Sequence, residues 1–212
     1  MKKKDFKDWK FEEINDEFGY KRHYKNFELL EIWLKAKNPI DEFESKELQS
    51  LAKEFLYNME SWNSEELKFF FLSPLIKLVG FYDNNYKPFT ERNLSATIGE
   101  YEFFGITDFL VSKGIQTPRQ PYFFLHKYNK DKRKNHDILG QLLAEMLTAQ
   151  QLNEIKFPLY GFYAVDMMHF FVILQANEYA VSDAFNPAKE KDILQIFKMM
   201  RFVKAEIDKH FE

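Results

Sequence analysis

The sequence predicts an α/β protein in which a mixed sheet is flanked by helices and preceded by an N-terminal α-helical lobe. Three observations favour this class. Apolar residues recur at helical spacing through residues 1–60, which contain almost no strand signal. Short apolar runs separated by turn residues follow up to residue 128, and a strongly patterned helix then precedes two more such runs. We therefore divide the 212-residue chain into a helical lobe, residues 1–60, and a core, residues 61–212.

The composition is that of a packed globular protein. Aromatic residues make up 18% of the chain, enough to fill a large core, so long disordered stretches are not expected. The formal net charge of −3 argues against an indiscriminate polyanion binder but is compatible with a local basic patch. The absence of cysteine excludes disulfides, thiolate zinc sites and cysteine nucleophiles. Because there is no secretory signal and no apolar run near the ~20 residues that cross a bilayer, we expect a cytoplasmic protein without a membrane partner.

The helical lobe is expected to contain two helices, over residues 26–37 and 43–59. The next helix begins at Asn63, which forms a capping-box pattern with Glu66 three residues later. Its apolar face continues to residue 80. Pro74 lies inside this pattern and should kink the helix or mark a local irregularity.

The core is expected to alternate strands and helices after residue 80. The predicted strands cover residues 86–90, 95–104, 106–112, 122–128, 159–165 and 168–174, with a short edge strand at 179–182. The predicted helices cover residues 137–153 and 192–207. The charged segment 130–136 is expected to be a loop.

Six stretches carry a resemblance to a known superfamily, and they occur in the order WNSEELKFFFLSPL, YEFFGITDFLVSKG, PYFFLHKYN, GQLLAEMLTAQQLN, PLYGFYAV and EYAVSDAF. From Trp62 onward the chain resembles the PD-(D/E)XK, or restriction-endonuclease-like, nuclease superfamily. It is similar to the N-terminal domain of type I restriction enzyme R subunits and to related uncharacterised bacterial proteins. The resemblance implies a restriction-endonuclease-like sheet in the core.

The resemblance also implies a metal site between two neighbouring strands. In the superfamily an Asp on one strand and a Glu-x-Lys on the next hold Mg²⁺, which polarises the scissile phosphate and activates a water. Asp108 matches the first position. We expect Lys127 to lie on the adjacent strand, on the same side of the sheet and within reach of Asp108.

The second strand departs from the superfamily pattern. One register places Lys127 at the family Glu and Asn129 at the family Lys, and the other places Lys127 at the family Lys and Leu125 at the family Glu. In both registers the strand lacks its carboxylate. In the first register the Lys127 ammonium takes the place of the metal ion and forms a salt bridge with Asp108.

Three further polar residues are candidates for the site. Glu145 could be the missing acid if the superfamily carboxylate has moved from the strand to the following helix. Otherwise it is an ordinary solvent-exposed glutamate, and this is what we expect. Gln141, one turn earlier, matches a family position that supports the site or contacts phosphate, or is a plain first-turn polar residue. Glu66 is an outer metal ligand or only a capping residue.

A basic run separates the second strand from the helix. Its members are Lys130, Lys132, Arg133 and Lys134, next to Lys127. A charge run in a loop is usually only solvated, but beside a nuclease-like edge it is also where a phosphate backbone could dock.

The sequence therefore favours a nuclease-fold protein with a degenerate metal site that binds DNA but is catalytically impaired. One alternative is an active Mg²⁺ nuclease that uses Asp108, Glu145 and Lys127. A second is a protein-interaction module on a nuclease scaffold. Mg²⁺ is the expected cofactor only for the active alternative. The sequence leaves the oligomeric state open.

Overall fold

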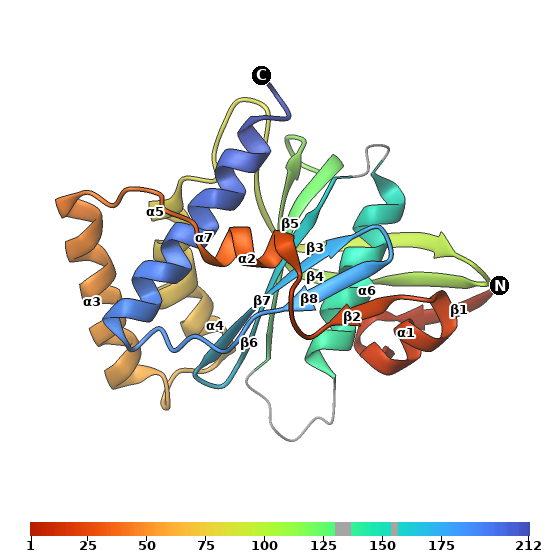
Figure 1. Cartoon of the computed structure of the whole chain (residues 1–212), viewed down its shortest axis with the longest axis horizontal. Coiled ribbons are helices and arrows are strands. Elements are labelled where there is room, and N and C mark those ends of the chain that lie inside the picture. The colour runs from red at the N-terminus through yellow and green to blue at the C-terminus, as the bar shows by residue number, and fades with distance from the viewer. Residues whose placement is uncertain (130–136, 154–156) are drawn as a thin grey trace.

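The computed structural model describes residues 1–129, 137–153 and 157–212. Within them, one mixed sheet has the strand order β1-β4-β5-β6-β7-β8-β2 (Figure 1). β1 and β5 pair with the first and second halves of β4 along one edge, and β3 pairs along the opposite edge of β4. The strands are β1 (Lys2–Asp5), β2 (Lys21–His23), β3 (Lys87–Ile98), β4 (Tyr101–Lys113), β5 (Arg119–Asn129), β6 (Leu159–Val165), β7 (Met168–Gln175) and β8 (Glu178–Val181). The prediction of an α/β fold with a mixed, helix-flanked sheet is confirmed.

Helices cover both faces of the sheet, and each face has its own apolar core (Figure 1). One face carries α2 (Glu28–Leu34), α3 (Glu42–Asn58), α4 (Ser64–Leu67), α5 (Ser73–Val79) and α7 (Glu190–Asp208). The other face carries α1 (Phe11–Phe18) and α6 (Ile138–Leu152), preceded by the short 3-10 turn Phe6–Asp8. The helices predicted at 43–59, 137–153 and 192–207 thus agree with α3, α6 and α7 to within two residues.

None of the helices in the described ranges is both long and apolar enough to cross a membrane.

Two segments of the N-terminal region are strands, so the prediction of purely helical structure over residues 1–60 is wrong there. β1 pairs in parallel with the first half of β4, and β2 pairs in parallel with β8. Both strands are short and mostly charged, and they therefore carry no apolar alternation by which the sequence would reveal them. Because β2 borders β8, the predicted edge strand at 179–182 is not at the edge.

The region predicted as three strands between residues 86 and 112 is one long hairpin. β3 and β4 pair in one register from Lys87–Ser112 to Ile98–Tyr101, with only the Glu91–Asp108 position left out, and the turn lies at Gly99, whose φ is +58°. The expected break near residue 91 is only a local distortion, at Glu91, which has a φ of +52°. The expected break at Gly105 is absent; a Cβ there would lie 2.6 Å from the Phe6 ring, so the glycine provides the close approach of Phe6 to β4.

The irregularity predicted from Pro74 is confirmed. The helix that begins at Asn63 continues from α4 into a π-helical turn, Lys68–Leu72, and then into α5. Proline lacks the N–H of a regular helical bond, and in the widened turn the Ser73 N–H instead reaches the Lys68 carbonyl. This turn presents Lys68 toward β4.

The start of α6 is fixed by the N-terminal segment. Asp137 caps the helix through Oδ1, which accepts from Gly140 N at 2.9 Å, while its Oδ2 accepts from Phe11 N at 2.8 Å. A Cβ on Gly140 would lie 2.5 Å from the Trp9 carbonyl oxygen, so only glycine lets the two backbones approach this closely. These contacts hold α6 in place over the sheet, and with it the side chain of Glu145.

Candidate functional site

Asp108 and Lys127 meet on neighbouring strands. The antiparallel register of β4 and β5 pairs Phe109 with His126, and one residue further along it places Asp108 opposite Lys127. Lys127 Nζ donates to Asp108 Oδ1 at 3.2 Å, and the two side chains are only 10% and 14% exposed. The prediction that these two residues lie on adjacent strands, on one side of the sheet and in contact, is confirmed.

Glu145 completes a buried three-residue cluster with Asp108 and Lys127. It projects from α6 toward the sheet, and its Oε1 lies 3.5 Å from Lys127 Nζ. The side chain has no exposed surface, and neither carboxyl oxygen accepts a hydrogen bond from the described part of the chain. The expectation of a solvent-exposed Glu145 is therefore wrong, because α6 is apolar on nearly every side and lies between the sheet and the N-terminal segment.

The burial of Glu145 changes its charge state. Burial raises the pKa of this carboxyl from its usual 4.5 to about 8; the neighbouring Asp108 charge raises it further, and Lys127 opposes both. At neutral pH the carboxyl is therefore mainly protonated. The cluster then places a neutral acid beside the ion pair of Asp108 and Lys127, which is a balanced arrangement for a buried site.

The cluster, in this arrangement, suits an ammonium better than Mg²⁺. Lys127 Nζ occupies the position between the two carboxyls and also lies 3.5 Å from the Ile106 carbonyl oxygen. Across the described ranges, no three acidic or histidine side chains come together as a metal-binding group. A hard divalent cation needs several oxygen ligands, and here one of the two nearest carboxyls is protonated near neutral pH.

Glu66 is not drawn into this cluster. Its Oε2 accepts from Asn63 N at 2.7 Å, and Asn63 Oδ1 accepts from Glu66 N at 2.9 Å. The predicted capping box is confirmed, and it accounts for Glu66 without a metal.

The remaining predicted site residues lie around α6 and the end of β5. Gln141 is buried in the first turn of α6, one helical turn before Glu145 and on the same side. The side chain of Asn129 and the basic residues Lys130, Lys132, Arg133 and Lys134 lie outside the described part of the structure. Their assigned roles remain predictions.

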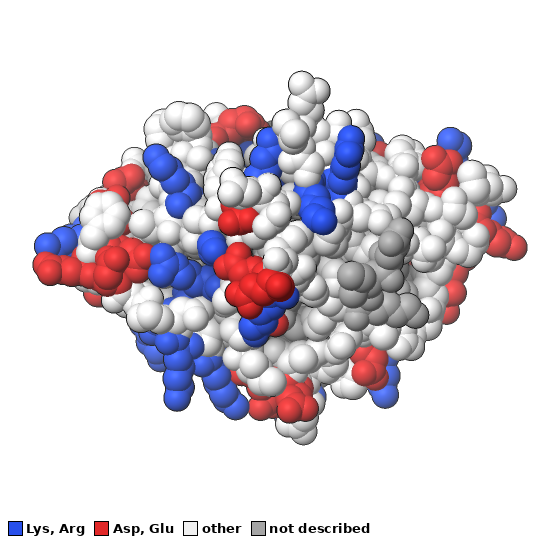
Figure 2. Space-filling model, turned by 90° about the horizontal axis from the view of Figure 1, so that it is seen from above, with Lys and Arg blue, Asp and Glu red and all other residues white. Residues whose placement is uncertain are grey.

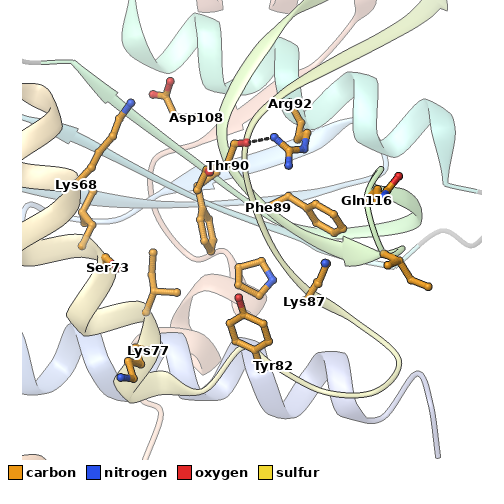
Figure 3. Close-up of a pocket in the computed structure, with 15 residues that line it drawn as sticks. Lys68, Ser73, Lys77, Tyr82, Lys87, Phe89, Thr90, Arg92, Asp108 and Gln116 are labelled. Atoms are coloured by element: carbon orange, nitrogen blue, oxygen red, sulfur yellow. Dashed lines mark hydrogen bonds between the residues drawn. The ribbon is translucent and has the colours of Figure 1, made fainter.

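A cleft of about 790 Å³ opens beside Asp108, between β3 on one side and the helix from Lys68 to Lys77 on the other (Figure 3). Asp108 lies at one end of this cleft, and the remaining charged residues of its lining are all basic: Lys68, Lys77, Lys87 and Arg92. The cleft is therefore positively charged although the whole chain has a net charge of −3. On the face seen from above, by contrast, acidic and basic side chains are interspersed (Figure 2).

Lys68 forms ion pairs with acidic side chains, whereas the other three cations of the cleft do not within the described residues. Its Nζ contacts Glu91 at 2.7 Å and Glu65 at 3.1 Å, and its end points toward Asp108 (Figure 3). Burial lowers the pKa of Lys68, but these partners and the Asp108 charge outweigh burial and raise it overall. Within the described residues, Lys77, Lys87 and Arg92 form no ion pair. Arg92 donates to the carbonyls of Thr90 and Glu91, and the charged ends of Lys87 and Arg92 lie 5.0 and 5.8 Å from the centre of the Phe89 ring.

Sequence reasoning missed these cleft residues. Lys68 and Lys77 belong to one helical segment, and Lys87 and Arg92 belong to β3, so the four form no local run that a sequence would display. Only the packing of the helix against the β3–β4 hairpin brings them together.

No protein-family model matches the chain, and no curated protein matches it.

Proposed function

We propose that this chain is a nucleic-acid-binding protein of restriction-endonuclease-like fold that holds phosphates in the cleft beside Asp108 and does not cleave them. One observation carries the proposal: Lys77, Lys87 and Arg92 line this cleft without an acidic partner among the described residues. Phosphate groups are the ligands that such clustered cations recognise in nucleic acids.

The cluster of Asp108, Lys127 and Glu145 supports the nuclease-like ancestry. Its acid, lysine and helix-borne glutamate come from two neighbouring strands and the next helix, which is the order that the superfamily resemblance implies. Lys127, however, pairs with Asp108 where the superfamily has a metal. A nuclease-like ancestor that lost its metal site but kept its phosphate-binding cleft would account for both features.

Neutralising the three free cations should reduce nucleic-acid binding for every sequence alike. For Lys77→Gln, Lys87→Gln and Arg92→Gln combined, we expect weaker binding and a log–log salt dependence flatter by about 2 to 3 units, because each lost phosphate contact removes about 0.7 to 0.9. Fluorescence anisotropy with labelled oligonucleotides over a salt series measures both quantities.

A matched control removes the same charge elsewhere. Lys35, Lys37 and Lys198 line a separate hollow between the α2–α3 connection and α7. Lys35 pairs with Glu31 at 3.3 Å on the surface, and the combined change of the three to Gln should leave the salt slope near that of the wild type. Equal losses in both triple variants would show non-specific attraction. If the wild type binds neither DNA nor RNA at low salt, a protein-interaction role on a nuclease scaffold replaces the proposal.

An active nuclease with a relocated acid is the second candidate, and one observation favours it: Glu145 lies 3.5 Å from Lys127 instead of facing solvent. We nevertheless expect no Mg²⁺-dependent cleavage. At about 4 Å the ammonium of Lys127 would repel a divalent cation by several kcal/mol, even at an effective dielectric of about 20.

The arrangement offers a test by reversal. Lys127→Glu combined with Asn129→Lys should restore divalent-cation binding, measured by calorimetry with Mn²⁺, because it recreates the carboxylate and lysine two residues apart on one strand. Cleavage of plasmid or oligonucleotide by the unmodified chain with Mg²⁺, lost in Asp108→Ala and in Glu145→Gln, would instead establish the second candidate.

A further inference from the structure

The basic cleft beside Asp108 also contains exposed apolar surface. Tyr82 is 70% exposed and Ile115 84% exposed, and both belong to its lining, together with Pro88 and the buried ring of Phe89. A lining that combines cations with a solvent-exposed aromatic ring suits a ligand with both anionic and flat apolar parts. A phosphate backbone alone would use only the cations.

Tyr82 lies between two of these cations. Figure 3 shows its ring at the mouth of the cleft, with Lys77 on one side and Lys87 on the other. In a nucleic-acid strand each base is flanked by phosphates, so a base against the ring would bring its phosphates toward the two lysines. Base–aromatic stacking is the usual way in which proteins hold single strands without reading their sequence.

The shape of the cleft also disfavours a duplex. A projecting helix or ribbon reads the bases of a duplex by entering a groove, whereas a hollow of about 790 Å³ offers no such element and could contact a duplex only through its phosphate backbone. In a duplex, the base faces are covered by their neighbours in the stack. A base can reach Tyr82 only if it is unpaired.

We infer that the cleft binds single-stranded nucleic acid, with an unpaired base stacked on Tyr82 and the adjacent phosphates held by Lys77 and Lys87. This inference rests on the proposed function and names its ligand class: DNA or RNA that is single-stranded or carries an unpaired end. The wild-type chain prefers a single strand over the duplex of the same sequence.

The test compares the full chain with three tyrosine variants, each checked for an unchanged melting temperature. Labelled single-stranded DNA, single-stranded RNA and duplex DNA are the probes, and anisotropy is the readout. Tyr82→Ala should weaken single-strand binding about 5- to 150-fold, and Tyr82→Phe should retain it because the ring remains. Tyr57→Ala is the matched control, since Tyr57 is 83% exposed on α3, outside the cleft.

The outcomes separate this inference from the proposed function. If the duplex binds at least as tightly as the single strand and Tyr82→Ala changes nothing, the inference fails. The proposed function still stands in that case if the triple variant at Lys77, Lys87 and Arg92 loses binding. If no probe binds at low salt, both fail. A loss in Tyr57→Ala equal to that in Tyr82→Ala would also overturn the role of the cleft.

Discussion

Replacing Lys127 by methionine is expected to lower the free energy of unfolding at pH 7 by about 3 kcal/mol. Removing one partner of a buried ion pair takes away the closest counter-charge of the other, which typically costs about 3 to 5 kcal/mol. We expect the lower end because Asp108 borders the cleft and keeps some access to water. Urea unfolding followed by circular dichroism measures the change.

The matched control is Lys46→Met. Lys46 pairs with Glu42 at 2.7 Å on the surface of α3, and exposed pairs of this kind contribute under about 1 kcal/mol. Adding Asp108→Asn to Lys127→Met should recover part of the lost stability, because the buried carboxylate charge that Lys127 balanced is then also removed. A loss no larger than that of Lys46→Met would contradict a structural role for the buried pair.

Replacing Glu145 by glutamine should remove a pH dependence of stability. The pKa of Glu145 is about 8 in the folded protein and about 4.5 when the chain is unfolded. Between these values the folded state holds a proton that the unfolded state has lost, so stability falls as pH rises, by about 1.4 kcal/mol per pH unit. Below this window both states are protonated, and above it both are ionised, so the effect stops at each end.

Stability measured by urea unfolding from pH 5 to pH 8 tests this expectation. From pH 5 to pH 8 the free energy of unfolding of the wild type should fall by on the order of 4 kcal/mol relative to that of Glu145→Gln. The stability of the glutamine variant relative to the wild type should therefore be greatest at the alkaline end. Glu47→Gln, on the exposed side of α3, should follow the wild type at every pH. Parallel curves for wild type and Glu145→Gln would mean that this carboxyl ionises as easily in the folded protein as in the unfolded chain.

The elements that the sequence predicted well are those whose signals are local. The capping box at Asn63, the irregularity before Pro74 and the apolar pattern of α6 each depend on residues within two or three helical turns. The strands β5, β6 and β7 have dense apolar runs with clear ends. Local propensity and tertiary packing agree in these segments.

The elements that the sequence missed depend on distant partners. The charged strands β1 and β2 exist only because β4 and β8 supply their hydrogen bonds. The hairpin continues through the polar residues around Glu91 because β4 pairs along its whole length.

The candidate site divides in the same way. Asp108 and Lys127 could be paired from the strand order, since adjacent strands place residues at matching positions on one face. The burial of Glu145 was missed because its surroundings come from distant parts of the chain: the sheet lies on one side of α6, and the segment around Trp9 and Phe11 packs against the start of the helix. The four basic residues of the cleft come from separate segments, so only the assembled fold reveals them.

The first 23 residues supply strands next to both β4 and β8, and this has a consequence for synthesis. β1 pairs with residues of β4 that lie about a hundred residues later in the chain, and β2 pairs with residues of β8 that lie more than 150 residues later. Contacts of such large sequence separation form slowly, because the chain must lose much of its freedom before they contribute. We therefore expect β2 to pair only after β8 has formed, and the contacts of the N-terminal segment with the start of α6 to form late in folding.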